Sequence, residues 1–294
     1  MPVKFVWPTR PKLTHGQMLD TGLSFPGGNG ATIIFVHGLT GTPYELRFLA
    51  TALNTVGYSA ICPRLPHHGG PIQILKNTTW QECYESIRQT LLSIDPSSHP
   101  GPIFVAGLSM GALLALLLAE EFPDRIRGVS CLSPTFFYDG WNTPWSSKLL
   151  PWVGRTPLKH CFYFKEGPPY GVKNETIRER IHSYYHDAPL NDTAMAARYG
   201  YAYIPVTLLY ELQRLAKHTG KLLARIQTPV QILQAKDDDM TSIKNANFIY
   251  DRIRSTVKEV VLLSNSYHLI NADQERETVA RQMIAFFDRL RIHP

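Results

Sequence analysis

Ser109 has the surroundings of a catalytic nucleophile. It is the centre of Gly107-Leu-Ser-Met-Gly111, which lies between an apolar, strand-like run at 102–106 and a helix-like run at 112–119. A serine on so tight a strand-to-helix turn has its hydroxyl exposed at the edge of a sheet, above the positive end of the helix. Glycines two residues away on either side remove side chains that would collide in the turn. The pattern predicts a nucleophile elbow with Ser109 as the attacking group.

A serine hydroxyl needs a general base, and the base needs an acid that fixes its tautomer. On a sheet of this kind the acid and then the histidine follow the serine along the chain, each in a loop after a strand. Two such loops are present: Asp237-Asp238-Asp239 follows an apolar run, and Ser266-Tyr-His268 follows the next one. Of the eleven histidines, His268 is the one between the last predicted strand and the closing helix, so we predict that it is the base. The three aspartates remain alternatives for the acid at this point.

Stabilising the oxyanion requires two backbone N–H groups aimed at the developing alkoxide. One is expected from Met110, directly after the candidate nucleophile. The other is expected from Leu39, because the loop His37-Gly-Leu-Thr-Gly41 follows the first core strand and its glycines permit close approach of the backbone to a substrate. His67 and His68 follow an earlier strand and are predicted to be loop or pocket-rim residues.

These candidates require a sheet that brings distant strand ends together. Apolar runs alternate with helical periods, which predicts a mostly parallel, doubly wound α/β sheet covered on both faces. The predicted strands are 31–36, 58–62, 102–106, 126–132, 229–235 and 259–263. The predicted core helices are 43–56, 80–94, 112–119, 243–254 and 273–290, and residues 1–30 are predicted to be an irregular lead-in with one short strand.

Two helix starts carry capping signals. Thr79-Trp-Gln-Glu82 is a capping box, and Thr42-Pro-Tyr-Glu45 combines an N-cap threonine, a proline at the first helical position and a capping glutamate.

Residues 134–228 interrupt this alternation. A segment of this length is too long for a loop, so we expect a mainly helical cap subdomain inserted into a core formed by 1–133 and 229–294. Its first part is rich in aromatic residues and proline, and 206–215 has clear helical periodicity. The aromatic side chains have two interpretations: they enclose an apolar substrate pocket, or they form a small core of the insert itself.

Composition narrows the class of protein. The chain has 294 residues, a formal charge of +6 and no Lys/Arg block, which argues against nucleic acid as a partner. The mild basicity favours solubility over attraction to anionic membranes or acidic acyl carriers. Cysteine spacing shows no metal-ligand pattern, and Cys62 and Cys131 are expected to be buried small hydrophobes. With no signal peptide and no apolar run long enough to span a bilayer, the expected location is the cytoplasm, without stable membrane insertion.

Taken together, these residues resemble the α/β-hydrolase superfamily, and in particular its bacterial carboxylesterase and monoacylglycerol lipase branch. The oxyanion loop 37–41 and the elbow 107–111 are similar to the His-Gly-Phe-Thr-Gly and Gly-Leu-Ser-x-Gly motifs of that branch. Gln234-Ala-Lys-Asp-Asp-Asp-Met240 is similar to its acid loop, and an ungapped match places the acid at Asp238. Residues 266–275 are similar to its histidine loop. Leu39 stands where an aromatic residue is usual, and the insert is longer than the cap of that branch.

The resemblance implies a serine carboxylic-ester hydrolase that forms an acyl-enzyme through Ser109, His268 and Asp238 and needs neither a metal nor an organic cofactor. The expected partner is a small acyl ester, which includes monoacylglycerol-like molecules. A thioesterase or a hydrolase of acyl-carrier esters is the alternative, because the same triad serves several acyl donors. A ligand-binding protein without catalysis is disfavoured, because all three triad positions are chemically competent.

Overall fold

The computed structural model describes residues 22–95, 97 and 101–292, so the first 21 residues of the expected lead-in lie outside the described part. Within that part, seven strands form one sheet in the order β1-β3-β2-β4-β5-β8-β9, in which β1 is antiparallel to β3 and the other pairs are parallel. The strands are β1 (Gly22–Phe25), β2 (Thr32–Val36), β3 (Ser59–Pro63), β4 (Ile103–Leu108), β5 (Ile126–Leu132), β8 (Val230–Ala235) and β9 (Lys258–Leu263). The predicted strands are confirmed to within two residues at each end.

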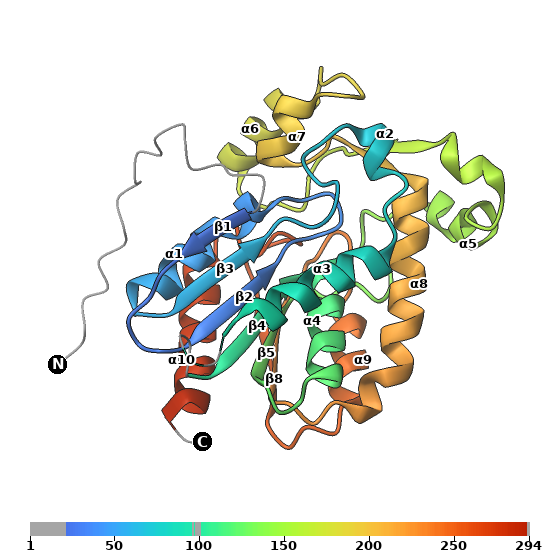
Figure 1. Cartoon of the computed structure of the whole chain (residues 1–294). Coiled ribbons are helices and arrows are strands. Elements are labelled where there is room, and N and C mark those ends of the chain that lie inside the picture. Colours follow the sequence, from blue (N-terminus) through green and yellow to red (C-terminus); the bar gives the residue numbers. More distant parts are fainter. Residues whose placement is uncertain (1–21, 96, 98–100, 293–294) are drawn as a thin grey trace.

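Helices cover both faces of this sheet (Figure 1). They are α1 (Arg47–Thr55), α2 (Ile72–Leu75), α3 (Trp80–Ser93), α4 (Met110–Glu121), α5 (Leu150–Val153), α6 (Glu175–Tyr185), α7 (Thr193–Tyr199), α8 (Val206–Leu222), α9 (Lys244–Arg252) and α10 (Arg276–Ile292). One hydrophobic cluster joins the sheet to α3, α4, α8 and α9, and a second joins it to α1 and α10. The mostly parallel, doubly wound α/β fold predicted from the sequence is therefore confirmed.

The central strands are apolar throughout because both of their faces are buried. Along β2, Ile34 and Val36 belong to the first cluster, whereas Ile33 and Phe35 belong to the second. Helix α4 is apolar around its whole circumference, with every residue from Met110 to Ala119 buried, because α8 and α3 cover the side that does not face the sheet. The elbow is thus anchored to the most deeply buried helix of the described part of the chain.

The two glutamates that were predicted to cap helices make different hydrogen bonds in the structure. Thr79 and Glu82 form the predicted capping box, in which Glu82 N–H donates to Thr79 Oγ1 and Thr79 N–H donates to Glu82 Oε2. Thr42 also caps its helix, which begins as the 3-10 helix η1 (Pro43–Leu46). The prediction for Glu45 is wrong, because its carboxylate accepts the N–H of Gly38 instead. A capping contact is local, whereas this contact closes the loop that precedes the helix.

The inserted stretch separates β5 from β8, which are neighbours in the sheet. It contains 3-10 helices η2 (Trp145–Leu149), η3 (Pro157–His160) and η4 (Leu223–Arg225), and strands β6 (Tyr163–Lys165) and β7 (Tyr203–Pro205), which pair antiparallel. Helix α8 packs along α4 and shares its hydrophobic cluster, so it belongs to the helical layer over the sheet (Figure 1). The division of the chain at 134 and 228 stays a prediction.

Candidate active site

The elbow has the strained geometry that the glycine spacing predicts. Ser109 has φ 54° and ψ −112°, a left-handed conformation that L-residues rarely adopt. A Cβ on Gly107 would lie 2.1 Å from the carbonyl oxygen of Gly111, and a Cβ on Gly111 would lie 2.1 Å from the carbonyl oxygen of Val36. The N–H of Ser109 donates to Leu132 in β5 at 2.8 Å. The turn is therefore possible only with glycine at both positions, and it is tied to the neighbouring strand.

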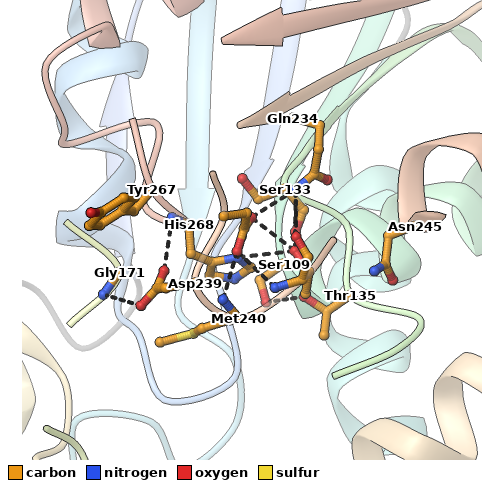
Figure 2. Close-up of polar contacts among 12 residues, drawn as sticks. Ser109, Ser133, Thr135, Gly171, Gln234, Asp239, Met240, Asn245, Tyr267 and His268 are labelled. Carbon is orange, nitrogen blue, oxygen red and sulfur yellow. Dashed lines mark hydrogen bonds and ion pairs between the residues drawn. The ribbon is translucent and has the colours of Figure 1, made fainter. Parts of the chain in front are cut away.

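Asp238 and His268 meet at the carboxyl ends of β8 and β9. His268 Nδ1 lies 3.0 Å from Asp238 Oδ2 and 3.1 Å from Oδ1, and both side chains are buried. Because ionised Asp238 only accepts hydrogen bonds, Nδ1 carries the proton and Nε2 of the neutral ring is free to accept one. Figure 2 shows this imidazole close to Ser109, although the two side chains belong to distant parts of the chain.

Asp238 is held by more donors than His268 alone. Its carboxylate accepts the N–H groups of Met240 and Thr241 at 2.8 Å, the hydroxyl of Thr241 at 2.9 Å and the amide of Gln234 at 2.7 Å. Burial by itself raises the pKa of Asp238, but the charge of His268 and these donors outweigh burial and hold the pKa below its usual value. The carboxylate is therefore ionised and fixed in orientation.

The neighbouring aspartates lie in different environments. Asp237 is exposed and pairs with Lys173 at 3.1 Å. Asp239 is buried, but it accepts backbone N–H groups from Gly171 and His268 and does not approach the imidazole nitrogens (Figure 2). Among the three consecutive aspartates, the structure brings Asp238 to the imidazole of His268.

The pKa of His268 reflects opposing influences. Burial disfavours the imidazolium and lowers the pKa, but the charge and hydrogen bond of Asp238, with the charges of Asp239 and Glu166, raise it above its ordinary value. The net effect is that the ring gains a proton more readily than a free histidine does.

In this structure the hydroxyl of Ser109 bonds to Thr135. The two hydroxyl oxygens lie 2.8 Å apart, and within the described part of the chain Ser109 makes no hydrogen bond to His268. Thr135 lies three residues after Leu132, the last residue of β5, at the same edge of the sheet as the other site residues. Catalytic hydrogen bonds are commonly loose before substrate binds. Thr135 was not a sequence candidate, and nothing in its local pattern distinguishes it from a loop threonine.

The predicted oxyanion residues lie beside the elbow. A Cβ on Gly38 would lie 3.8 Å from the Cβ of Ser109, which places the loop after β2 against the nucleophile. Leu39 and Met110 are both buried and line one small apolar cavity with Trp80. Met110 is the first residue of α4, where the backbone N–H has no partner within the helix.

A buried histidine holds the peptide group that contains the N–H of Leu39. His37 Nδ1 lies 2.9 Å from the carbonyl oxygen of Gly38, which is the other end of the same peptide, while Nε2 accepts the N–H of Leu65 at 3.1 Å. This pattern assigns the proton to Nδ1, and burial together with His68 lowers the pKa of His37 well below its ordinary value, so the ring is neutral. His37 thus fixes the plane of the Gly38–Leu39 peptide.

His68 bonds to the same loop. Its Nε2 lies 2.8 Å from the carbonyl oxygen of Leu39, and its ring lies 4.9 Å from that of His37. His68 lies in the loop after β3, as predicted, and its buried ring lines the small cavity beside Leu39 and Met110. One signal in the sequence indicated the contact between His68 and the oxyanion loop: His68 follows β3, which lies next to β2 in the sheet.

Two further carboxyl groups face the site without contacting Ser109. Burial raises the pKa of Glu45 to about 7, although the N–H of Gly38 at 2.6 Å opposes that rise. Burial and the charge of Asp239 raise the pKa of Glu166, in the insert, to about 7, and the charge of His268 opposes this. In the described residues, no cluster of three or more His, Cys, Asp or Glu side chains is arranged to bind a metal.

A largely apolar cavity of about 280 Å³ opens next to the nucleophile. Thr135, the hydrogen-bond partner of Ser109, is part of its wall. The other lining residues come from the start of the insert, from the segment at α5 and from α8: Phe136, Phe137, Tyr138, Ser147, Leu150, Pro151, Leu212, Gln213 and Ala216. The cavity therefore lies between the insert and the helical layer over the sheet.

The sheet is mostly parallel, with a serine on a strained turn after one strand and a paired aspartate and histidine after two later strands. This is the architecture of an α/β-hydrolase, and this chain is one. Within that class it belongs to the family described as serine aminopeptidase, S33, whose model matches residues 28–275.

Individual relatives agree with this assignment. The chain is 29% identical to a thermostable monoacylglycerol lipase of Bacillus sp. (strain H-257), over 87% of this chain and 89% of the relative. It is 24% identical to a carboxylesterase of Bacillus subtilis (strain 168), over 91% and 96% of the two chains. The crystal structure of a monoacylglycerol lipase of Paleococcus ferrophilus has the same fold, with a TM-score of 0.72, 21% identity and coverage of 92% and 98%. The predicted resemblance to the carboxylesterase and monoacylglycerol lipase branch is confirmed.

Replacing Asp238 by asparagine should lower the pKa of His268, because it removes the negative charge that stabilises the imidazolium. NMR titration of isotopically labelled histidine measures this pKa directly. Asp237→Asn is the matched control, since this exposed carboxylate pairs with Lys173 and should leave the titration unchanged. An equal shift in both variants, or none in Asp238→Asn, would contradict the assignment of Asp238 as the electrostatic partner of His268.

Proposed function

We propose that Ser109, His268 and Asp238 form a catalytic triad that hydrolyses carboxylic esters through an acyl-enzyme. The chain is a carboxylic-ester hydrolase like the lipase and carboxylesterase it resembles along most of its length. The observation that carries the residue assignment is the buried pair of His268 and Asp238, at the sheet edge where the strained elbow holds Ser109.

In the proposed mechanism, Ser109 Oγ leaves Thr135 and attacks the acyl carbonyl carbon while His268 Nε2 takes its proton. Asp238 keeps Nδ1 protonated and stabilises the imidazolium. The N–H groups of Leu39 and Met110 bind the oxygen of the tetrahedral intermediate. The imidazolium returns its proton to the leaving alcohol, and water then cleaves the acyl-enzyme by the same steps.

Because His268 acts as a neutral base and its pKa is raised, kcat/KM should fall as the pH drops through a value above 6.5.

The substrate is proposed to be an ester with a hydrocarbon acyl chain. The apolar cavity supports this, because Thr135 both bonds to Ser109 and forms part of the cavity wall, which brings the cavity close to the nucleophile. Phe136 and Tyr138 line the cavity, whereas Trp145 and Trp152 are exposed, so the aromatic residues of the insert fall into two groups. The monoacylglycerol lipases among the relatives favour a monoacylglycerol-like ester over a thioester or an acyl-carrier ester.

Ser109→Ala should abolish the burst of p-nitrophenol from a short acyl ester and reduce turnover by roughly 10⁴-fold or more, because no other group can form the acyl-enzyme. Stopped-flow absorbance measures the burst, and a fluorophosphonate probe should label the parent protein but not the variant. Unchanged turnover in the variant would refute the mechanism. Faster release of thiol from acyl-coenzyme A than of alcohol from a monoacylglycerol would transfer the assignment to a thioesterase.

His37→Ala should lower kcat by about 10- to 100-fold with little change in KM, because the Leu39 donor loses its fixed orientation and acts mainly on the transition state. His37→Asn is the matched control, since an asparagine amide can donate to the Gly38 carbonyl from nearly the position of Nδ1. Steady-state kinetics on one soluble ester compares them. A His37→Asn variant as slow as His37→Ala would show that the ring acts through packing alone.

Filling the cavity should shorten the acyl chain that the enzyme accepts. Each buried methylene contributes about 0.8 kcal/mol, or roughly fourfold in kcat/KM, so the parent enzyme should prefer octanoate to acetate esters. Ala216→Phe places a ring in the cavity and should remove this preference while leaving acetate turnover unchanged. A series of p-nitrophenyl esters tests both expectations. A parent enzyme that is no faster on octanoate than on acetate would count against the pocket.

A further inference from the structure

We propose that Asn245 is a positioning residue of the active site and that it works together with Asp139. The two side chains tie the loop that contains Thr135 to the loop that contains Asp238. Asn245 is the second residue of α9, and Asp139 lies in the loop after β5, where the insert begins. The proposal rests on the proposed triad and goes beyond it, because it assigns a part in the reaction to two residues outside the triad.

The side-chain amide of Asn245 is buried, and distant groups use both of its ends. Its Oδ1 accepts the N–H groups of Phe136 and Phe137, at 2.7 and 2.8 Å. Its Nδ2 donates toward Asp139 Oδ1 at 3.1 Å and toward the carbonyl oxygens of Ser242 and Phe137 at 3.1 and 3.2 Å. Because donors surround the acceptor end and acceptors surround the donor end, the amide is fixed in one orientation.

The bond to Phe136 determines where Thr135 lies. The N–H of Phe136 and the carbonyl of Thr135 belong to one peptide group, so Asn245 fixes the backbone directly after Thr135. The hydroxyl of Thr135 lies 2.8 Å from that of Ser109 (Figure 2). Phe136 also lines the apolar cavity and packs against Phe248 of α9, with ring centroids 5.0 Å apart. Asn245 therefore positions both the partner of the nucleophile and part of the cavity wall.

Asp139 fixes the loop that contains Asp238. Its carboxylate accepts the N–H of Ser242 at 2.8 Å and the hydroxyl of Ser242 at 2.6 Å. The N–H of Ser242 and the carbonyl of Thr241 belong to one peptide group, and Thr241 donates both its N–H and its hydroxyl to Asp238. Asp139 thus holds the backbone next to a residue that orients the carboxylate of the triad.

Gly140 brings the same two loops into direct backbone contact. Its N–H donates to the carbonyl oxygen of Met240 at 3.0 Å, and the N–H of Met240 donates to Asp238 at 2.8 Å. A Cβ on Gly140 would lie 2.4 Å from the carbonyl carbon and the carbonyl oxygen of Asp239. Because the backbones approach so closely, a shift of one loop must move the other.

The place of these loops in the sheet gives the contact its consequence. Strand β5 lies between β4, which leads to Ser109, and β8, which leads to Asp238. The loop after β5 therefore joins the nucleophile side of the site to the acid side. Loss of the Asn245 amide leaves two backbone N–H groups without their acceptor, so the loop must move to satisfy them. A misplacement of about 1 Å in an active site can cost about 100-fold in rate.

Asn245→Ala should lower kcat on p-nitrophenyl acetate by about tenfold or more and leave KM within about twofold, because it misaligns the reacting groups without changing the contacts of the small acyl group. It should also reduce the preference for octanoate over acetate by about fourfold or more, the contribution of about one buried methylene, because the cavity wall at Phe136 is no longer fixed. Steady-state kinetics on the two p-nitrophenyl esters measures both effects.

An exchange of the two polar groups provides a second test. Asn245→Asp places two carboxylates together at a contact where Nδ2 and Asp139 Oδ1 lie 3.1 Å apart, so it should be as slow as Asn245→Ala. The double variant Asn245→Asp/Asp139→Asn restores one donor and one acceptor at this contact and should recover at least about half of the parental kcat.

Two variants of the same helix are the controls. Asn247→Ala removes an exposed asparagine two residues further along α9. Ile249→Ala removes a buried side chain that makes none of these hydrogen bonds, so it lowers the stability of the fold without releasing either loop. Both should keep the parental kcat and the parental chain-length preference below their melting temperatures, which thermal unfolding measures for every variant.

Parental kcat and chain-length preference in Asn245→Ala would overturn the proposal. An equal loss of kcat in Ile249→Ala, or no recovery in the exchange variant, would also overturn it, because the asparagine would then act through stability alone. Failure of the proposed function gives a different result, since Ser109→Ala would then be as active as the parent.

Discussion

The site depends on one steric constraint, the contact of the elbow with the first core strand. Gly111 at the start of α4 meets the carbonyl of Val36 at the end of β2, at a distance that no side chain could tolerate. That contact forces Ser109 into a left-handed conformation and brings the oxyanion loop, which begins one residue after Val36, against the nucleophile. The cost of the strained serine, on the order of 1–3 kcal/mol, is offset by α4, which is buried on all sides. A less buried helix would let the turn relax and withdraw the hydroxyl.

Two of the polar groups that support the reaction, Asp238 and His37, are each held in one protonation state. Asp238 is ionised because five donors, including His268, surround it, and His37 is neutral because burial and its two backbone partners require this. His268 is the group left free to change state, since its Nε2 has no hydrogen bond in the described structure. Preorganisation of this kind avoids rearranging dipoles during the reaction, which is the main source of electrostatic catalysis.

Much of this arrangement could be predicted, because strands buried on both faces leave continuous apolar runs and nucleophile elbows have a strict glycine spacing. The run at 126–132 coincides with β5, and the order of the loops placed His268 correctly at the end of β9. The local sequence pattern predicted the wrong hydrogen-bond partner where a side chain can reach both a neighbouring group and a more distant one. Glu45 satisfies the spacing of a capping box, yet a bond to Gly38 seven residues earlier prevails.

The residues that the sequence did not reveal share a different property. Thr135 and His68 are defined by which loops the sheet order makes adjacent, and this information is absent from their own neighbourhoods. Composition likewise could not divide the aromatic residues of the insert, because the burial of Phe136 and the exposure of Trp145 depend on tertiary contacts, such as that of Phe136 with Phe248 in α9. Such side chains become interpretable once the strand order β2-β4-β5-β8-β9 is known.

Helix α8 makes the two walls of the cavity unequal. One wall, with Leu212 and Ala216, belongs to α8, most of whose other buried residues pack in the core over the sheet, so most substitutions along this helix would disturb that core. Leu150 and Pro151, in another part of the wall, belong to the four-residue helix α5, which packs against α8, η2 and η3 rather than against the sheet. Divergence of chain-length preference among descendants of this protein should therefore accumulate at α5, where a new pocket shape can evolve without loss of folding stability.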